Sequence, residues 1–141
     1  MRRNSGLYSI APGALIGGCD PRHPVRNAAA TNSEAGAIGR ITTDGHVSEF
    51  SRGITRFEGL RGIAAGPDGA MWFTECESDC GFTGKAKTGR ITMNGRITEY
   101  SNLTPSSHPS EIVQGPDGNM WLLEENMNRV ARIRIVGKHL S

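Results

Sequence analysis

Residues 62–75 read Gly-Ile-Ala-Ala-Gly-Pro-Asp-Gly-Ala-Met-Trp-Phe-Thr-Glu, and this stretch decides the fold. Its centre, Gly-Pro-Asp-Gly, is a tight-turn sequence, because proline presets φ, aspartate bonds its own backbone and glycine accepts a positive φ. Apolar residues on both sides of the turn predict two antiparallel strands. Residues 111–124 repeat the pattern as Glu-Ile-Val-Gln-Gly-Pro-Asp-Gly-Asn-Met-Trp-Leu-Leu-Glu. A hairpin that occurs twice in one short chain indicates a repeat architecture.

A second kind of hairpin alternates with the first. Residues 37–43 and 46–51 flank Asp44-Gly45, a dipeptide that closes two-residue hairpins. Residues 89–93 and 96–101 flank Asn94-Gly95 in the same way. The segment Gly-Arg-Ile-Thr starts at 39 and again at 89. Two hairpins per period make four strands per repeat, which is the sequence signature of a β-propeller blade.

The full repeat is expected to hold strands at 61–65, 70–75, 89–93 and 96–101. We therefore expect an all-β protein, an incomplete β-propeller of about two to three four-stranded antiparallel blades. The blades are a half blade at 37–51, a full blade at 61–101 and a partial blade at 110–135. Residues 1–36, rich in Gly, Pro, Asn and Ala, are expected to be irregular or poorly ordered. Residues 37–141 form the partial propeller.

The expected strand count is too small for a closed ring. Nine strands fall short of the smallest propellers, which have about four blades. The terminal blades would then expose sheet faces that are built to be covered. The sequence predicts a fragment or truncated frame in preference to a protomer that completes a ring by self-association through its exposed blade faces.

Composition excludes several classes of function. The net charge of +2 and the few aromatic residues give no basic platform for nucleic acid. No apolar run reaches the ~18 residues that a membrane helix needs. We expect a cytoplasmic protein. The alternative, an exported form or a lipoprotein, rests on Arg2-Arg3, a short apolar run and Cys19.

The loop expected at 76–88 carries two cysteines and two lysines, Cys76, Cys80, Lys85 and Lys87. Two reduced thiols in a surface loop are the prediction for a cytoplasmic protein, and a local disulfide is the alternative for an exported one. A metal pair is disfavoured, because no further His or Cys lies nearby in the sequence.

The repeat residues carry a family resemblance. The pattern Gly-Pro-Asp-Gly-x-Met-Trp-Phe-Thr-Glu, followed by Gly-Arg-Ile-Thr-x-Asn/Asp-Gly-x-Ile-Thr-Glu-Tyr, resembles the repeat of the bacterial streptogramin B (virginiamycin B) lyases over residues 37 to about 135. The resemblance implies a seven-bladed propeller that confers antibiotic resistance. It also implies a Mg²⁺-dependent carbon–oxygen lyase that opens the ester ring of a small cyclic depsipeptide by elimination.

The resemblance places the acid/base histidine of these lyases in Pro-His-x-Ile, at the start of the first strand of a blade. Arg61 and Ser110 stand at those positions here. His108 lies just before the second position and becomes the candidate catalytic residue. The metal carboxylate after the tryptophan strand is matched by Glu125, with Cys76 as its counterpart in the earlier repeat.

Glu124 and Glu125 together are the candidate metal ligands. Neighbouring residues of a strand face opposite ways, so only one of them can reach a shared ion. The incomplete histidine pattern leaves two functions open. One is a lyase that is active or inactive as it stands, and the other is a non-catalytic propeller fragment that binds a ligand or a protein.

Overall fold

The structure is a computed structural model that describes residues 8–16, 27–32, 36–41, 45–55, 58–77 and 84–136. Those residues form three antiparallel sheets in which strands that follow one another in sequence pair with one another. The all-β prediction is confirmed, and a short 3₁₀ turn, η2 (Glu125–Met127), is the one helical segment assigned within those ranges. None of their elements is a helix long and apolar enough to cross a membrane.

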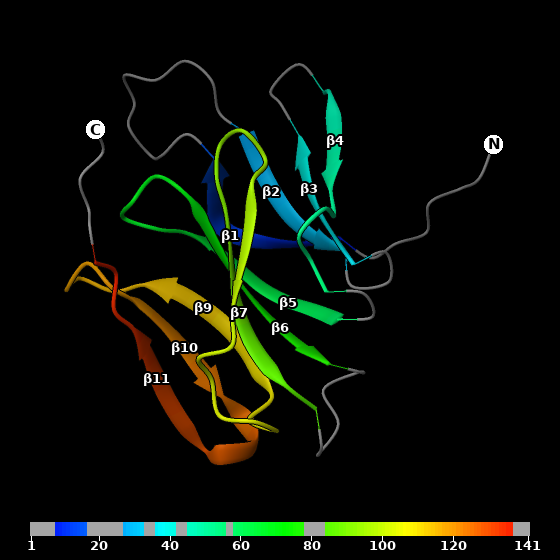
Figure 1. Ribbon diagram of the computed structural model, residues 1–141. Coiled ribbons are helices and arrows are strands. Elements are labelled where there is room, and N and C mark those ends of the chain that lie inside the picture. Colours follow the sequence, from blue (N-terminus) through cyan, green and yellow to red (C-terminus); the bar gives the residue numbers. More distant parts are fainter. Residues whose placement is uncertain are drawn as a thin grey trace.

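The sheets follow one another along the chain and fan out in space (Figure 1). The first sheet contains β1 (Tyr8–Ile16), β2 (Asn27–Asn32), β3 (Ala37–Ile41) and β4 (Val47–Phe50). The second contains β5 (Glu58–Ala65), β6 (Met71–Glu77), β7 (Ala86–Ile91) and β8 (Ile97–Tyr100). The third contains β9 (Pro109–Gln114), β10 (Met120–Glu124) and β11 (Arg129–Ile133). The first strands of the sheets adjoin one another, β1 against β5 and β5 against β9.

The expectation of irregular structure before residue 37 is wrong for two segments. β1 and β2 pair with each other, and β2 pairs with β3, so the half blade expected at 37–51 is the outer half of a four-stranded sheet. The pairing register of β1 shifts between Ile10 and Leu15, around Pro12, which cannot donate to a ladder. Because of this irregularity, and because β2 is rich in alanine, neither segment shows the alternation of apolar and polar residues that predicts a strand. Both form strands nevertheless, because hydrogen bonding to a neighbouring strand outweighs their weak β propensity.

Two expectations for the loop after β6 also change. Cys76 lies in β6, is buried and forms a disulfide, so it is neither a surface residue nor a reduced thiol. Lys87 lies in β7 and is buried, and its ammonium donates to Thr55 Oγ1 at 2.8 Å and reaches Glu99 Oε2 at 3.3 Å. Cys19 and Cys80 lie outside the described residues. Cytoplasmic localisation stays a prediction.

The Gly-Pro-Asp-Gly turns form as predicted and also hold the tryptophans. Asp68 Oδ1 accepts from the Trp72 indole N–H at 3.1 Å, and its Oδ2 accepts from Arg90 Nε at 2.8 Å. Asp117 repeats the bond to Trp121 at 2.9 Å. A Cβ on Gly66 would lie 2.4 Å from Trp72 Cδ1, so the first glycine of the motif makes room for the indole.

Two hydrophobic cores lie between the sheets. One joins Ile38 of the first sheet to an apolar face of the second, whose buried members are Leu60, Ile63, Met71, Phe73 and Ile91. The other joins Trp72 of the second sheet to Ile112, Met120 and Leu122 of the third sheet and to Ile135, which follows its last strand. The prediction that Trp72 packs between blades is confirmed. The second sheet therefore offers one face to the first sheet and the opposite face to the third.

Replacing Gly62 with alanine tests the close approach of β5 and β9. A Cβ on Gly62 would lie 2.6 Å from the Ser110 carbonyl oxygen and 3.1 Å from the Ile112 nitrogen. Because both neighbours are backbone atoms, we expect Gly62→Ala to lower the free energy of unfolding by about 1–3 kcal/mol in urea titrations. Gly59→Ala on the same strand is the control, since its nearest neighbours lie at 3.5 and 3.6 Å. Equal stability of the two variants would contradict this account.

The pH dependence of stability tests the Asp68 turn. Burial raises the pKa of Asp68, but the bonds from Arg90 and Trp72 outweigh it and hold the pKa below 3.8. A lowered folded-state pKa adds stability above pH 3.8, and this stability is lost as the pH falls through the folded pKa. We expect Asp68→Asn to cost about 1–2 kcal/mol at neutral pH. The difference in the free energy of unfolding between the variant and the wild type, measured by urea titration, should become smaller in acid. A deficit that does not change with pH would contradict the assignment.

Candidate functional site

The candidate residues gather at one end of the interface between the second and third sheets. His108 directly precedes β9 and Glu125 directly follows β10, and the pairing of Glu124 with Pro109 brings these ends together. The Glu125 N–H donates to the His108 carbonyl at 3.2 Å, and the Asn126 N–H donates to Ser107 at 3.1 Å. The loop before β9 is therefore fixed to the turn after β10.

Unusual backbone conformations are concentrated here. Ser106, His108 and Asn128 have φ values of 62°, 52° and 48°, and they are the non-glycine residues with positive φ in the described part of the chain. Such conformations cost free energy and persist where the surroundings impose them, frequently at ligand sites. Asn126 Nδ2 supports this loop by donating to the Ser106 carbonyl at 3.0 Å. The backbone that carries His108 is thus fixed to the turn after β10.

The His108 ring lies between an anion and a cation. Its Nδ1 is 3.0 Å from Glu125 Oε2, and its Nε2 is 3.2 Å from Nη2 of Arg61. Guanidinium nitrogens only donate, so Nε2 accepts and the ring proton of a neutral imidazole is assigned to Nδ1, where it donates to Glu125. A carboxylate that orients an imidazole in this way leaves Nε2 as a proton acceptor.

Ser110 and Thr74 connect the two sheets beneath this pair. The Thr74 hydroxyl donates to the Ser110 carbonyl at 2.6 Å and accepts from the Gly62 N–H at 3.0 Å. The Ser110 hydroxyl is buried and makes no hydrogen bond of good geometry, yet it adjoins the Glu125 carboxylate closely enough to favour the charged form. With His108 and Arg61 it lowers the pKa of Glu125 below 4.5.

The two glutamates predicted as metal ligands face different surroundings. Glu124 is buried and its carboxylate bonds Arg129 at 2.8 Å and the Thr104 N–H at 3.2 Å. Those partners give Glu124 a structural role in the third sheet. Glu125 is half exposed beside His108. The expectation that only one of the two glutamates can reach a shared metal ion stays a prediction.

His108, Glu125 and Arg61 form the rim of this interface, and they do not by themselves fit a Mg²⁺ ion. Mg²⁺ prefers several oxygen ligands in octahedral geometry. Glu125 offers one carboxylate, its neighbour His108 offers nitrogen, and the Arg61 cation lies beside them. No group of three or more His, Cys, Asp or Glu residues able to hold a metal occurs within the described ranges.

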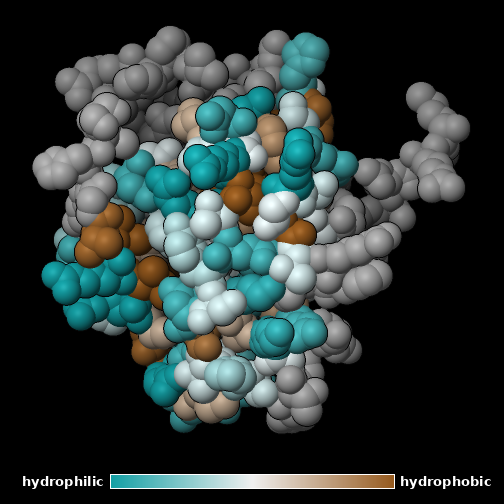
Figure 2. Space-filling model, in the orientation of Figure 1, coloured by the Kyte–Doolittle hydropathy of each residue, from teal (hydrophilic) through white to brown (hydrophobic). Residues whose placement is uncertain are grey.

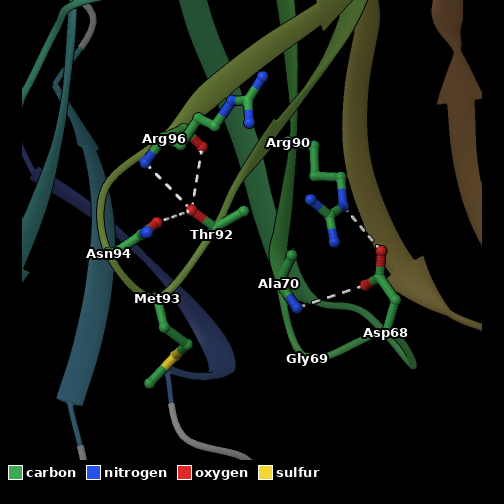
Figure 3. A pocket seen from close by; sticks show the side chains of 8 residues that line it. All are labelled: Asp68, Gly69, Ala70, Arg90, Thr92, Met93, Asn94 and Arg96. Atoms are coloured by element: carbon green, nitrogen blue, oxygen red, sulfur yellow. Dashed lines mark hydrogen bonds and ion pairs between the residues drawn. The ribbon is translucent and has the colours of Figure 1, made fainter. Parts of the chain in front are cut away.

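A hollow lies at the other end of the second sheet, away from His108. It is lined by Asp68, Arg90, Thr92, Asn94, Arg96 and their neighbours. Figure 3 shows the Arg90–Asp68 pair on one side and the Thr92–Asn94–Arg96 turn on the other. The drawn bonds tie Asp68 to Arg90 and fix the turn that closes β7 and β8. This hollow is therefore explained by folding.

Comparisons with known proteins identify the class and the family. The structure resembles a catalytically inactive histidine-to-alanine variant of virginiamycin B lyase from Staphylococcus aureus, crystallised with quinupristin, with a TM-score of 0.73 and 29% identity. A streptogramin B lyase structure matches with a TM-score of 0.65 and 28% identity. The three sheets are thus blades of a lyase-type β-propeller. The profile of the virginiamycin B lyase family matches residues 23–140, and the chain belongs to this family.

The coverage of these matches is asymmetric. The Staphylococcus aureus lyase structure is matched over 97% of this chain but 41% of its own length, and the streptogramin B lyase over 79% and 35%. None of the curated proteins compared matches the chain. The chain thus spans less than half of the lyases that it resembles.

The sequence pointed to His108 and Glu125 separately but missed how Arg61 joins them. Arg61 and Ser110 occupy equivalent places, because Ile63 and Ile112 two residues later are both buried in the cores. Arg61 belongs to one blade, and His108, Ser110 and Glu125 belong to the next. A sequence signal existed, since both positions precede a first-strand isoleucine by two residues. Their meeting across the interface needed the structure.

Carboxyl NMR titration tests the Ser110–Glu125 contact. We expect Ser110→Ala to raise the pKa of Glu125 toward 4.5, because the Ser110 hydroxyl is the largest cause of its lowering. Glu99 is the internal control, since Thr55 and Lys87 lower its pKa against burial and neither touches Ser110. An unchanged Glu125 titration, with Glu99 also unchanged, would refute the contact.

Proposed function

We propose that the blades of this chain supply an acid/base rim to a carbon–oxygen lyase that opens cyclic depsipeptides of the streptogramin B class. The observation that carries the proposal is the His108 imidazole, held by Glu125 at Nδ1 and presenting Nε2 as an acceptor. Membership of the virginiamycin B lyase family and the likeness to a lyase crystallised with quinupristin support it. The rim lies where the resemblance expects catalytic residues, before a first strand and after a tryptophan strand.

The elimination needs a base for the proton α to a carbonyl. In the proposed reaction Nε2 of His108 accepts that proton, and the electrons of the C–H bond form the Cα=Cβ double bond. The Cβ–O bond breaks, and its electron pair leaves with the ester carboxylate. Glu125 stabilises the imidazolium that results, as a carboxylate does in other acid/base pairs.

Arg61 has a second part in this proposal. Its guanidinium lies 3.2 Å from Nε2, so a substrate that approaches the histidine displaces it. Arginine donors close to a carbonyl oxygen stabilise the negative charge that develops on that oxygen when the α-proton leaves. Arg61 therefore positions the substrate and favours the enolate, in the place where the family pattern has a histidine.

Magnesium enters the proposal through the family resemblance. Glu125 is the rim carboxylate that would help to hold the ion, and a bound Mg²⁺ would supply positive charge to an enolate oxygen. The rim residues need partners from elsewhere in an assembled ring to complete its coordination. Whether the lyase reaction requires Mg²⁺ is thus tested on the assembled propeller.

Reaction of the full chain with quinupristin tests the lyase proposal. Incubation with Mg²⁺ should give a ring-opened product of unchanged mass, separated by chromatography and identified by mass spectrometry, and a chelator should suppress it. His108→Ala should lower the rate by about 10²–10⁴-fold, the usual contribution of a general base. His46→Ala, at an exposed site away from the rim, is the control. A product heavier by one water, or equal rates for both variants, would contradict elimination by His108.

A binding module is the second candidate, and one observation favours it. Arg61 and Ser110 hold the two positions where the family pattern has its histidine, and neither is a base near neutral pH. Calorimetric titration separates the two functions. Quinupristin binding without any conversion, weakened by Arg61→Ala, would support a binding module and refute the lyase.

A further inference from the structure

Three consecutive carbonyl groups in the loop before β9 accept hydrogen bonds from two consecutive residues of the turn after β10. The Ser106 carbonyl accepts from Asn126 Nδ2 at 3.0 Å, and the Ser107 carbonyl accepts from the Asn126 N–H at 3.1 Å. The His108 carbonyl accepts from the Glu125 N–H at 3.2 Å. Asn126 therefore holds the two residues directly before His108, one with its side chain and one with its backbone.

The backbone conformation of this loop gives these bonds their importance. Ser106 and His108 have φ values of 62° and 52°, in the left-handed region that non-glycine residues rarely adopt. Such conformations persist where the surrounding structure imposes them. The Ser106 N–H is fixed from the second blade, since it donates to the Gly84 carbonyl just before β7 at 2.8 Å. Asn126 fixes the Ser106 carbonyl, so this residue is held at both of its polar backbone groups.

Asn126 has no part in the packing of the blades. It belongs to neither hydrophobic core of the described residues, and among those residues the Ser106 carbonyl is the one partner of its side chain. Figure 2 shows mostly hydrophilic and neutral side chains at the lower end of the molecule, where the turn between β10 and β11 lies in Figure 1. The same turn, η2, carries Glu125, whose carboxylate lies 3.0 Å from Nδ1 of His108. One turn thus contacts both the backbone and the imidazole ring of His108.

We propose that Asn126 is a positioning residue for His108: its side chain holds the loop so that the imidazole meets Glu125 through Nδ1 and keeps Nε2 as an acceptor. Without the bond from Nδ2, the Ser106 carbonyl is released and nothing offsets the cost of the left-handed conformation. The ring of His108 then loses its fixed place beside Glu125. A displacement of about 1 Å at a catalytic group lowers a rate by up to about 100-fold, so Asn126 acts on catalysis through the loop.

The catalytic part of this inference rests on the proposed lyase function, whereas its structural part does not. The ring proton of neutral His108 lies on Nδ1, because Nε2 accepts from Arg61 and Nδ1 faces Glu125. The position of this proton follows the hydrogen bonds that the ring makes. Nitrogen chemical shifts therefore report whether the imidazole is held, and they need no substrate.

NMR of the full chain tests the positioning role, with the His108 signals identified by their loss in His108→Ala. At a pH where the ring is neutral, the wild type should show the Nδ1–H form, and Asn126→Ala should shift the signals toward a mixture of both forms. Asn119→Ala is the matched control, because it removes a side-chain bond of the same length, 3.0 Å to the Ile135 N–H. Asn119 precedes β10 and Asn126 follows it, so the control should leave the His108 signals unchanged.

Kinetics with quinupristin tests the catalytic part. Asn126→Ala should lower kcat by about 10–100-fold and leave KM unchanged, because the base is displaced while the substrate contacts remain. Asn119→Ala should keep the wild-type kcat. A wild type that converts no quinupristin refutes the lyase proposal, and the nitrogen signals then decide the positioning role by themselves.

Three spectroscopic outcomes overturn the inference. They are a wild type without the Nδ1–H form, an Asn126→Ala spectrum equal to that of the wild type, and equal changes in Asn126→Ala and Asn119→Ala. Asn126→Asp keeps the size of the side chain but replaces the donor with an oxygen, so it should shift the His108 signals at least as far as alanine. Hydrogen exchange on the wild type needs no variant. The N–H groups of Ser106, Glu125 and Asn126 should exchange slowly, and fast exchange at all three would contradict a held loop.

Discussion

The burial of Trp72 between two blades is the interaction on which the rest of the structure depends. Asp68 fixes the indole from one side, and the apolar face of the third blade covers it from the other. Ring burial of this size is among the largest single contributions to a core. The same aspartate binds Arg90 and closes the β5–β6 turn, so one carboxylate joins the turn, the tryptophan and the third strand of the blade.

The candidate site is a consequence of the same interface. Gly62 allows β5 and β9 to approach, and Thr74 connects both strands by bonding Gly62 and Ser110. That approach brings Arg61 of one blade to His108 of the next. A site formed across a packed interface is rigid, because its members belong to sheets whose cores hold them in register.

The candidate site residues and the structural residues differ in their exposure and in their hydrogen-bond and charge partners. Glu124 and Asp68 are bonded to Arg129 and Arg90 and stabilise the blades. Glu125 and His108 contact one another, His108 also contacts Arg61, and both stay accessible at the rim. A partly exposed carboxylate–imidazole pair contributes little to stability, so its presence in a loop of left-handed conformations is more readily explained by function than by folding.

Much of the fold could be read from the sequence, because its signals are local. The Gly-Pro-Asp-Gly turns, the Asn-Gly turn and the alternating strands predicted the second blade to within three residues at each boundary. Interblade burial of Trp72 also followed from the repeat. The sequence did not predict the first two strands, because the proline-interrupted β1 and the alanine-rich β2 show no clear period. They form by pairing, β2 with β3 and β1 with β2.

The site was only half determined by sequence. Residue type and position relative to the repeat selected His108 and Glu125, and chain order near β9 and β10 was enough to place them close together. The tertiary structure alone decided that Arg61 reaches the same imidazole and that Glu124 turns to Arg129. The physical reason is that turns and strand alternation are set by neighbours in sequence. Contacts between blades depend on how closely two sheets pack, and that distance is set by all the side chains between them.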